Sequence, residues 1–115
     1  DGQSRPELRQ TPTRLTGMVI GSLVLTLHLP QSQSLKAKRQ VVSSLTHRVR
    51  RTFNVAVAEV ESLDSWQLAV IGVACVSNDR RHADEMLNKV ANWVAEDGGR
   101  GEALLTHQDI ELIQA

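Results

Sequence analysis

Residues 34–61 have the sequence SLKAKRQVVSSLTHRVRRTFNVAVAEVE, and this stretch joins a basic amphipathic helix to a β-strand. At about 100° per residue, its first half places apolar side chains on one side of a helix and polar ones on the other. The apolar positions are Leu35, Val42, Leu45 and Val49, and the polar positions are Lys36, Arg39, Ser43, His47 and Arg50. Ser34 precedes the first apolar residue, and its hydroxyl can accept a hydrogen bond from a free amide of the opening turn. The helix is therefore predicted to begin with Ser34 as its N-cap.

Charge is distributed unevenly along the chain. Residues 35–51 contain six Lys or Arg residues and no Asp or Glu, which gives this segment a net charge of +6. From residue 53 onward there are four cations and eleven carboxylates, a net charge of −7, while residues 1–17 add +1. The neutral total thus conceals a dipolar molecule.

Two interpretations fit the cations of the first helix. They form either the solvated back of an ordinary surface helix or a surface that attracts the phosphate backbone of a nucleic acid without base contacts. Lys38 is a separate case because it falls among the apolar positions. Its side chain either extends out of the first turn to water or pairs with a carboxylate such as Glu59.

Length and composition favour one cytoplasmic domain. At 115 residues the chain is long enough for a single core. Residues 1–17 are polar and contain two prolines, so we expect a non-core extension before a single domain at 18–115. The single cysteine, Cys75, excludes an internal disulfide and favours a reducing, intracellular location. No apolar run approaches the length of a membrane span, so no membrane association is expected.

Hydrophobic periodicity predicts four strands and two helices. Strands are expected at 19–29, 53–61, 68–76 and 102–113, the third of them central because it is apolar on both faces. In the last strand, Leu104, Ile110 and Leu112 are expected to share a face. Ser77 or Asn78 is expected to cap the second helix, which should end near residues 97–99. Its apolar positions are Ala83, Met86, Leu87, Val90 and Val94.

The predicted order is β-α-β-β-α-β, which indicates an α+β, ferredoxin-like fold. With right-handed crossovers it forms a four-stranded antiparallel sheet with two helices on one face. The opposite face of the sheet would receive apolar side chains from the first and third strands. We therefore expect that face to be covered by a second copy of the chain or by the N-terminal extension, with a homo-oligomer favoured.

The sequence contains no constellation that indicates catalysis or a metal site. The four histidines, His28, His47, His82 and His107, have no metal-binding spacing. Cys75 lies in an apolar strand and is interpreted as a core residue. An acylphosphatase-like activity would need an arginine in the loop at 30–34, and that loop has none. We expect no enzyme activity, no catalytic residues, no cofactor and no metal.

Base stacking of the kind used by RNA-recognition domains is also not expected. Those domains place aromatic rings in the middle of the first and third strands, where this chain has aliphatic, small or polar residues. Trp66 stands at the beginning of a strand and is interpreted as an end plug of the core in preference to a stacking platform.

Several motifs in the same order resemble the YlxP-like family of small bacterial proteins, a domain of unknown function. They are MVIGSLVLTLHLP from residue 18, SLKAKRQVV from residue 34, FNVAVAEV from residue 53, the pair Trp66-Gln67, and VSNDRRHADEML from residue 76. The similarity extends from residue 18 to about residue 113 and departs from relatives in the turn at 62–65. It implies the ferredoxin-like fold and a gene beside translation and ribosome-maturation genes, such as those for initiation factor two and ribosome-binding factor A. It implies no catalytic residues.

Together these observations predict a non-enzymatic accessory module that binds structured RNA or the small ribosomal subunit. Arg80 and Arg81 begin the second helix, on the same side of the sheet as the first, and are expected to extend its basic surface. The candidate nucleic-acid-binding residues are Lys36, Arg39, His47, Arg50, Arg51, Arg80 and Arg81. The alternative is a homo-oligomeric regulatory or ligand-sensing domain whose site lies on the open sheet face, lined by Ile20, Val24, His28 and neighbours from the third strand.

Overall fold

The structure is a computed structural model, and it describes residues 16–115. The extension predicted for residues 1–17 therefore lies outside the described residues, apart from its last two positions. The elements are β1 (Val19–His28), α1 (Leu35–Thr52), β2 (Ala56–Glu61), β3 (Leu68–Ser77), α2 (Arg80–Trp93), the short π-helix η1 (Val94–Gly98) and β4 (Leu104–Gln114). The predicted β-α-β-β-α-β order is confirmed.

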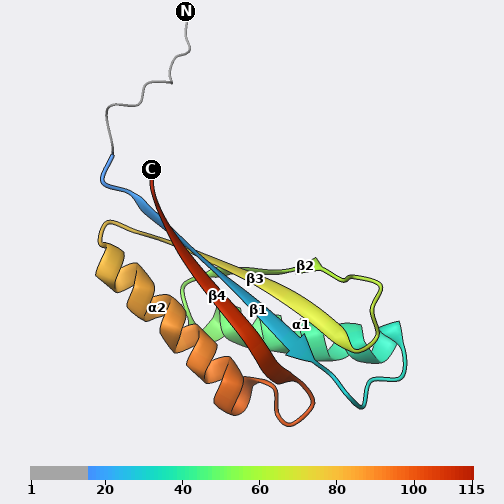
Figure 1. The fold of residues 1–115 in the computed structure, drawn as a ribbon. Helices are drawn as coiled ribbons and strands as arrows, with labels where there is room; N and C mark the ends of the chain where they lie inside the picture. The colour runs from blue at the N-terminus through green and yellow to red at the C-terminus, as the bar shows by residue number, and fades with distance from the viewer. Residues whose placement is uncertain (1–15) are drawn as a thin grey trace, which may run out of the picture.

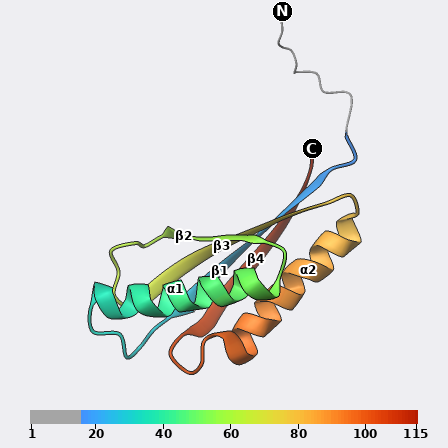
Figure 2. The same ribbon diagram turned by 180° about the vertical axis from the view of Figure 1, so that it is seen from behind.

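The four strands form one antiparallel sheet in the order β2-β3-β1-β4 (Figure 1). Both helices lie on the same side of this sheet, which is the near side in Figure 2. This arrangement is consistent with the predicted ferredoxin-like α+β fold. β3 lies between β2 and β1, so its predicted central position is also confirmed.

The core lies between the sheet and the helices. Alternate residues of β1 point toward the helices, and their side chains are buried: Val19, Leu23, Leu25 and Leu27, followed by Leu29 just after the strand. The predicted apolar side of α1 faces them with Val42, Leu45 and Val49, and α2 adds Ala83, Leu87 and Val90. The side chains that are apolar with a period of 2 in the strand and of 3.6 in the helices are thus the ones buried in this core.

The helix starts agree with the prediction at α1 and differ at α2. The Ser34 hydroxyl accepts a hydrogen bond from the Ala37 amide at 3.0 Å, as predicted. At α2 the N-cap is Asp79, whose carboxylate accepts from the Arg81 amide at 2.9 Å, so the predicted cap at Ser77 or Asn78 is wrong. The Ser77 hydroxyl instead accepts from the Asp79 amide at 3.1 Å and holds the turn before the helix.

A β-bulge changes the predicted face of Leu104. The register between β1 and β4 shifts between Thr26 and Leu27, so Leu104 lies opposite His28 on the side of the sheet away from the helices. Leu104 is 50% exposed there, whereas Ile110 and Leu112 pack against the core. The prediction that all three share a face is wrong for Leu104 because the extra residue of a bulge reverses the alternation beyond it.

The side of the sheet opposite the helices, here called the open face, carries exposed apolar side chains from all four strands. These include Val24, Val60, Leu68, Val76, Leu104 and Ile113. Trp66, just before β3, is 53% exposed. Its interpretation as an end plug of the core is therefore wrong.

Candidate nucleic-acid interface

Six residues on the solvent side of α1 line a shallow, wide-open hollow of about 590 Å³, here called the groove. Three of the predicted residues, Lys36, Arg39 and His47, line this groove. The other lining residues are Gln40, Ser43 and Ser44, which add an amide and two hydroxyls between the cationic side chains. Gln40 and Ser44 were not among the predicted site residues, although the spacing of four residues from Lys36 through Gln40 to Ser44 is a signal for one helix face.

The cations of the groove have no ion-pair partner among the described side chains. Lys36 and Arg39 are both exposed. Among the side chains that the structure describes, the ion pair found is between Lys38 and Glu59, so no described carboxylate lies within ion-pair distance of Lys36 or Arg39. α1 also has no acid in its first turn. The positive charge of Lys36 and Arg39 is therefore not neutralised by an ion pair, although Glu102 lines the adjacent hollow.

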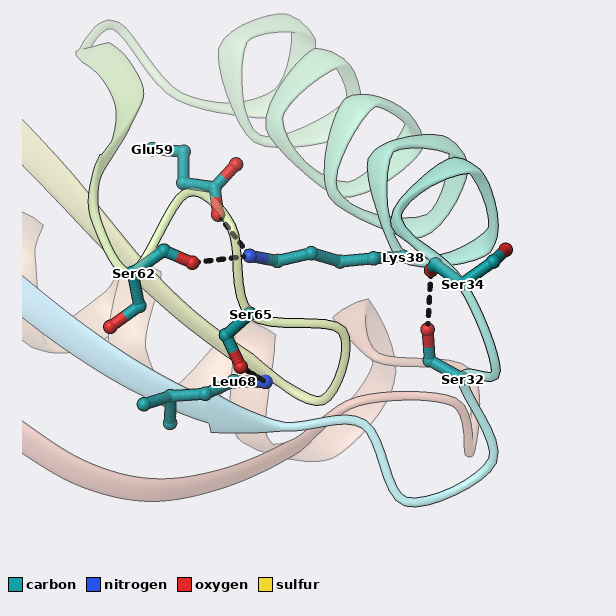
Figure 3. Close-up of polar contacts among 7 residues, drawn as sticks. All are labelled: Ser32, Ser34, Lys38, Glu59, Ser62, Ser65 and Leu68. Carbon is teal, nitrogen blue, oxygen red and sulfur yellow. Dashed lines mark hydrogen bonds and ion pairs between the residues drawn. The ribbon is translucent and has the colours of Figure 1, made fainter.

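Lys38, by contrast, points away from the groove, toward Glu59 and Ser62 (Figure 3). Its side chain is 0% exposed, and its Nζ lies 2.6 Å from Oε2 of Glu59. The same Nζ donates a hydrogen bond to the Ser62 carbonyl at 2.8 Å. Of the two alternatives for this residue, the structure shows the pairing with Glu59. Lys38 joins α1 to the end of β2 and the turn that follows it.

Arg48 is also engaged within the molecule. Its guanidinium donates to the Gly98 carbonyl at 2.8 Å and to the Ser44 hydroxyl at 3.3 Å. It lies 5.6 Å from the ring centroid of Trp93, which is within the range of a cation–π contact. Burial lowers the pKa of Arg48, repulsion from Arg100 lowers it further, and Glu102 partly opposes both effects. Arg48 thus fixes η1 against α1.

Arg50 and Arg51 remain exposed in the last turn of α1. Nη1 of Arg50 donates a hydrogen bond to the Val57 carbonyl at 3.1 Å, and this bond anchors the side chain over β2. A guanidinium has five N–H donors, so this bond leaves others free for a ligand. Both cations are also favoured there by the helix dipole, whose C-terminal end is negative.

Arg80 and Arg81 are exposed in the first turn of α2, outside the groove. Residues from the end of α1 and from α2 line a small hollow of about 250 Å³, so the two helices adjoin near this end. That hollow includes Glu85 and Lys89. The surface around the start of α2 therefore carries both signs of charge, unlike the exposed side of α1.

Among the side chains that the structure describes, no group of three His, Cys, Asp or Glu residues is placed to hold a metal ion. Cys75 is buried on the helix side of β3, which confirms its interpretation as a core residue. Burial raises the pKa of its thiol, and a hydrogen bond with the Gly21 backbone opposes this shift.

The open face contains a second, mainly apolar hollow of about 380 Å³. Its lining consists of small residues, valines and one leucine: Ser22, Leu23, Val24, Ala56, Val57, Ala58, Val60, Gly72, Val73 and Ala74. Of the residues predicted to line a site on this face, Val24 does so, whereas Ile20 and His28 do not line this hollow.

Comparison with known proteins places the chain in a family. The family described as "Protein of unknown function (DUF503)" matches residues 20–108. The chain belongs to the DUF503 family. It is also 36% identical over 61 residues to the uncharacterized protein YlxP of Bacillus subtilis (strain 168). That match covers 53% of this chain and 66% of the Bacillus protein, just under two thirds of its length. The predicted YlxP-like membership is therefore confirmed.

Two solved structures are similar in outline. The de novo designed protein Foldit4 has a TM-score of 0.47 at 10% identity, over 85% of this chain and 98% of the design. SnoaB, a cofactor-independent oxygenase from Streptomyces nogalater, has a TM-score of 0.40 at 16% identity, over 87% of this chain and 94% of that protein.

No helix within residues 16–115 combines the length and the apolar content needed to cross a bilayer.

Proposed function

We propose that this DUF503 protein is a non-enzymatic cytoplasmic module that binds structured RNA in a ribosomal particle through the exposed side of α1. The observation that carries the proposal is the groove on α1, where Lys36, Arg39 and His47 lie together without a described carboxylate in ion-pair distance. The resemblance to a family whose genes lie beside translation genes supports the choice of a ribosomal RNA over other polyanions.

The distribution of the helix cations supports this proposal. Lys38 and Arg48 hold the fold together and are bonded to protein groups. The four other Lys and Arg residues of α1 are exposed: Lys36, Arg39, Arg50 and Arg51. Of these, Arg50 also donates one hydrogen bond to the Val57 carbonyl. From residue 36 to residue 50 a helix rises about 21 Å, so this row of cations can follow several successive phosphates.

This mode of binding depends on charge and not on base identity. Lysine and arginine side chains that neutralise phosphates release condensed counterions, so affinity falls steeply as salt rises. The serine hydroxyls and the Gln40 amide of the groove can add hydrogen bonds to phosphate or ribose oxygens. We propose that Arg80 and Arg81 add a weaker, secondary contact because acids lie close to them.

Co-sedimentation with small ribosomal subunits across a potassium chloride series tests the proposal. We expect the wild-type chain to sediment with the subunits at low salt and to be released as salt rises. The variant Lys36→Gln/Arg39→Gln should be released at lower salt because two phosphate contacts are removed.

The matched control is Lys89→Gln/Arg100→Gln, which removes the same charge from exposed residues outside the α1 groove. It should sediment like the wild type. Equal release of both variants, or sedimentation that does not respond to salt, would contradict the proposal.

A further inference from the structure

We infer that the open face of the sheet is the interface between two copies of this chain, related by a twofold axis parallel to the strands. The exposed fractions on this face are large for aliphatic side chains: 69% for Val76, 49% for Val60 and 47% for Ile113. Contiguous exposed apolar surface of this kind is typical of an interaction site. This inference is independent of the proposed RNA binding, because α1 lies on the other side of the sheet (Figure 2).

The size of the face suits a dimer. Three strands of about ten residues and the six-residue β2, spaced about 4.8 Å apart, give a projected area of about 590 Å². A stable interface typically buries about 800 Å² on each partner. The uneven surface of a pleated sheet adds to its projected area, so the open face by itself is close to the required size.

The chemistry of the face suits a second copy better than the chain's own N-terminal segment. Residues 1–15 contain only Leu8 and Leu15 as large apolar side chains, too few to cover exposed apolar residues on all four strands. The open face carries no Lys or Arg on its strands, and its three carboxylates, Glu61, Asp109 and Glu111, lie on the edge strands β2 and β4. An apolar centre with a charged rim is the usual anatomy of a protein interface.

The register of the sheet selects the direction of the twofold axis. One row across the open face consists of Ala58, Gly72, Val24 and Asp109, in the strand order β2-β3-β1-β4. An axis parallel to the strands reverses this order in the partner, so that Val24 lies over the partner's Gly72. Val24 would then pack into the hollow beside Gly72, against Val60, whose side chain lies over Gly72 in each copy. The same axis places Asp109 over the partner's Ala58.

The alternative axis, perpendicular to the strands, gives a poorer fit. It would place Gly72 over Gly72 and leave the two hollows facing each other unfilled, which costs contact energy. It would also place Asp109 over Asp109, and opposed like charges destabilise an interface. Packing and electrostatics therefore favour the same arrangement.

Size-exclusion chromatography with light scattering tests the interface. We expect a mass of twice the 12.7 kDa chain. Val24→Glu, which places a charge in the centre of the face, should return the mass to that of one chain while circular dichroism shows an unchanged fold. The control Asn92→Glu adds the same side chain at an exposed position of α2 and should remain dimeric. A monomeric wild type, including one whose face is covered by its own residues 1–15, would overturn the inference, as would a dimer that Val24→Glu leaves intact.

Cysteine cross-linking tests whether the twofold axis is parallel or perpendicular to the strands. The native Cys75 is buried on the helix side of β3, so a short bis-maleimide should report only engineered thiols. A mixture of Ala58→Cys and Asp109→Cys chains should give a cross-linked heterodimer, whereas Ala58→Cys alone should not cross-link. Cross-linking of Ala58→Cys alone, with none in the mixture, would overturn the proposed arrangement.

Discussion

Lys38 shows how one residue of a basic helix can serve the fold instead of a ligand. Its ammonium group is fully buried between Glu59 and the Ser62 carbonyl. Ser62 has a φ of 59°, an unfavourable conformation for a residue other than glycine. The hydrogen bond from Lys38 to its carbonyl holds this strained turn in place.

The variant Lys38→Met should lower the free energy of unfolding by about 3–5 kcal/mol, because it leaves the largely buried Glu59 carboxylate without its partner. Urea unfolding measures this loss. The double variant Lys38→Met/Glu59→Leu removes both charges and should recover much of the stability. A single variant as stable as the wild type would contradict the structural role of the pair.

Cys75 provides a pH-dependent prediction at the same scale. Burial raises the pKa of its thiol, so the folded state favours the protonated form. The thiol's contribution to stability is therefore present below the pKa of an unfolded cysteine and is lost as the pH rises through the raised folded value. Alkylation by iodoacetamide at mildly alkaline pH should accordingly be much slower in the folded chain than in the urea-unfolded chain. Equal rates in the two states would show that the thiol is accessible.

At the scale of the elements, local sequence predicted most of the fold. The 3.6-residue period and the Ser34 cap locate α1, because both depend on residues close together in the chain. The bulge in β4 and the exposure of Trp66 could not be predicted in this way. Each depends on how segments distant in sequence meet: the bulge on the pairing of β4 with β1, and the exposure of Trp66 on what packs at the end of the sheet.

The candidate site was predicted less completely than the fold. Helical periodicity correctly grouped Lys36, Arg39 and His47 on one side of α1. It could not show that Arg48 is bonded to Gly98, because that contact joins residues 50 positions apart. It also could not show whether Arg80 and Arg81 adjoin the groove, since their position depends on the packing of α2.

The turn between η1 and β4 gives a prediction about the stability of the fold. A Cβ added at Gly99 would lie 2.0 Å from the Ala103 carbonyl oxygen, and this contact is with backbone that cannot rotate away. Gly99→Ala should therefore destabilise the protein by about 1–3 kcal/mol as the turn is forced open. Thermal unfolding measures the change.

Gly101 offers a matched control in the same turn. It has a φ of +78° and no atom within 4 Å of an added Cβ. Asparagine tolerates this left-handed conformation better than most residues, so Gly101→Asn should cost less than Gly99→Ala. The reverse order would contradict the steric explanation.

At the scale of the whole molecule, the sheet separates two surfaces with different chemistry. The exposed side of α1 is cationic, and the open face on the other side of the sheet is mainly aliphatic (Figures 1 and 2). If two copies meet through their open faces, both α1 helices remain on the outside of the dimer. The dimer would then present two phosphate-binding surfaces. Its affinity for one large RNA that contacts both surfaces would be higher than the affinity of a single chain.

The salt dependence of affinity for a structured RNA tests the central claim, that the exposed cations of α1 contact phosphates. In fluorescence anisotropy titrations, phosphate contacts by Lys36, Arg39, Arg50 and Arg51 predict a slope of log K against log salt of about −2.8 to −3.6. For Lys36→Gln/Arg39→Gln the slope should become shallower by about 1.4–1.8, while Lys89→Gln/Arg100→Gln should leave it unchanged. A wild-type slope near zero, or a slope that Lys36→Gln/Arg39→Gln does not alter, would contradict the claim.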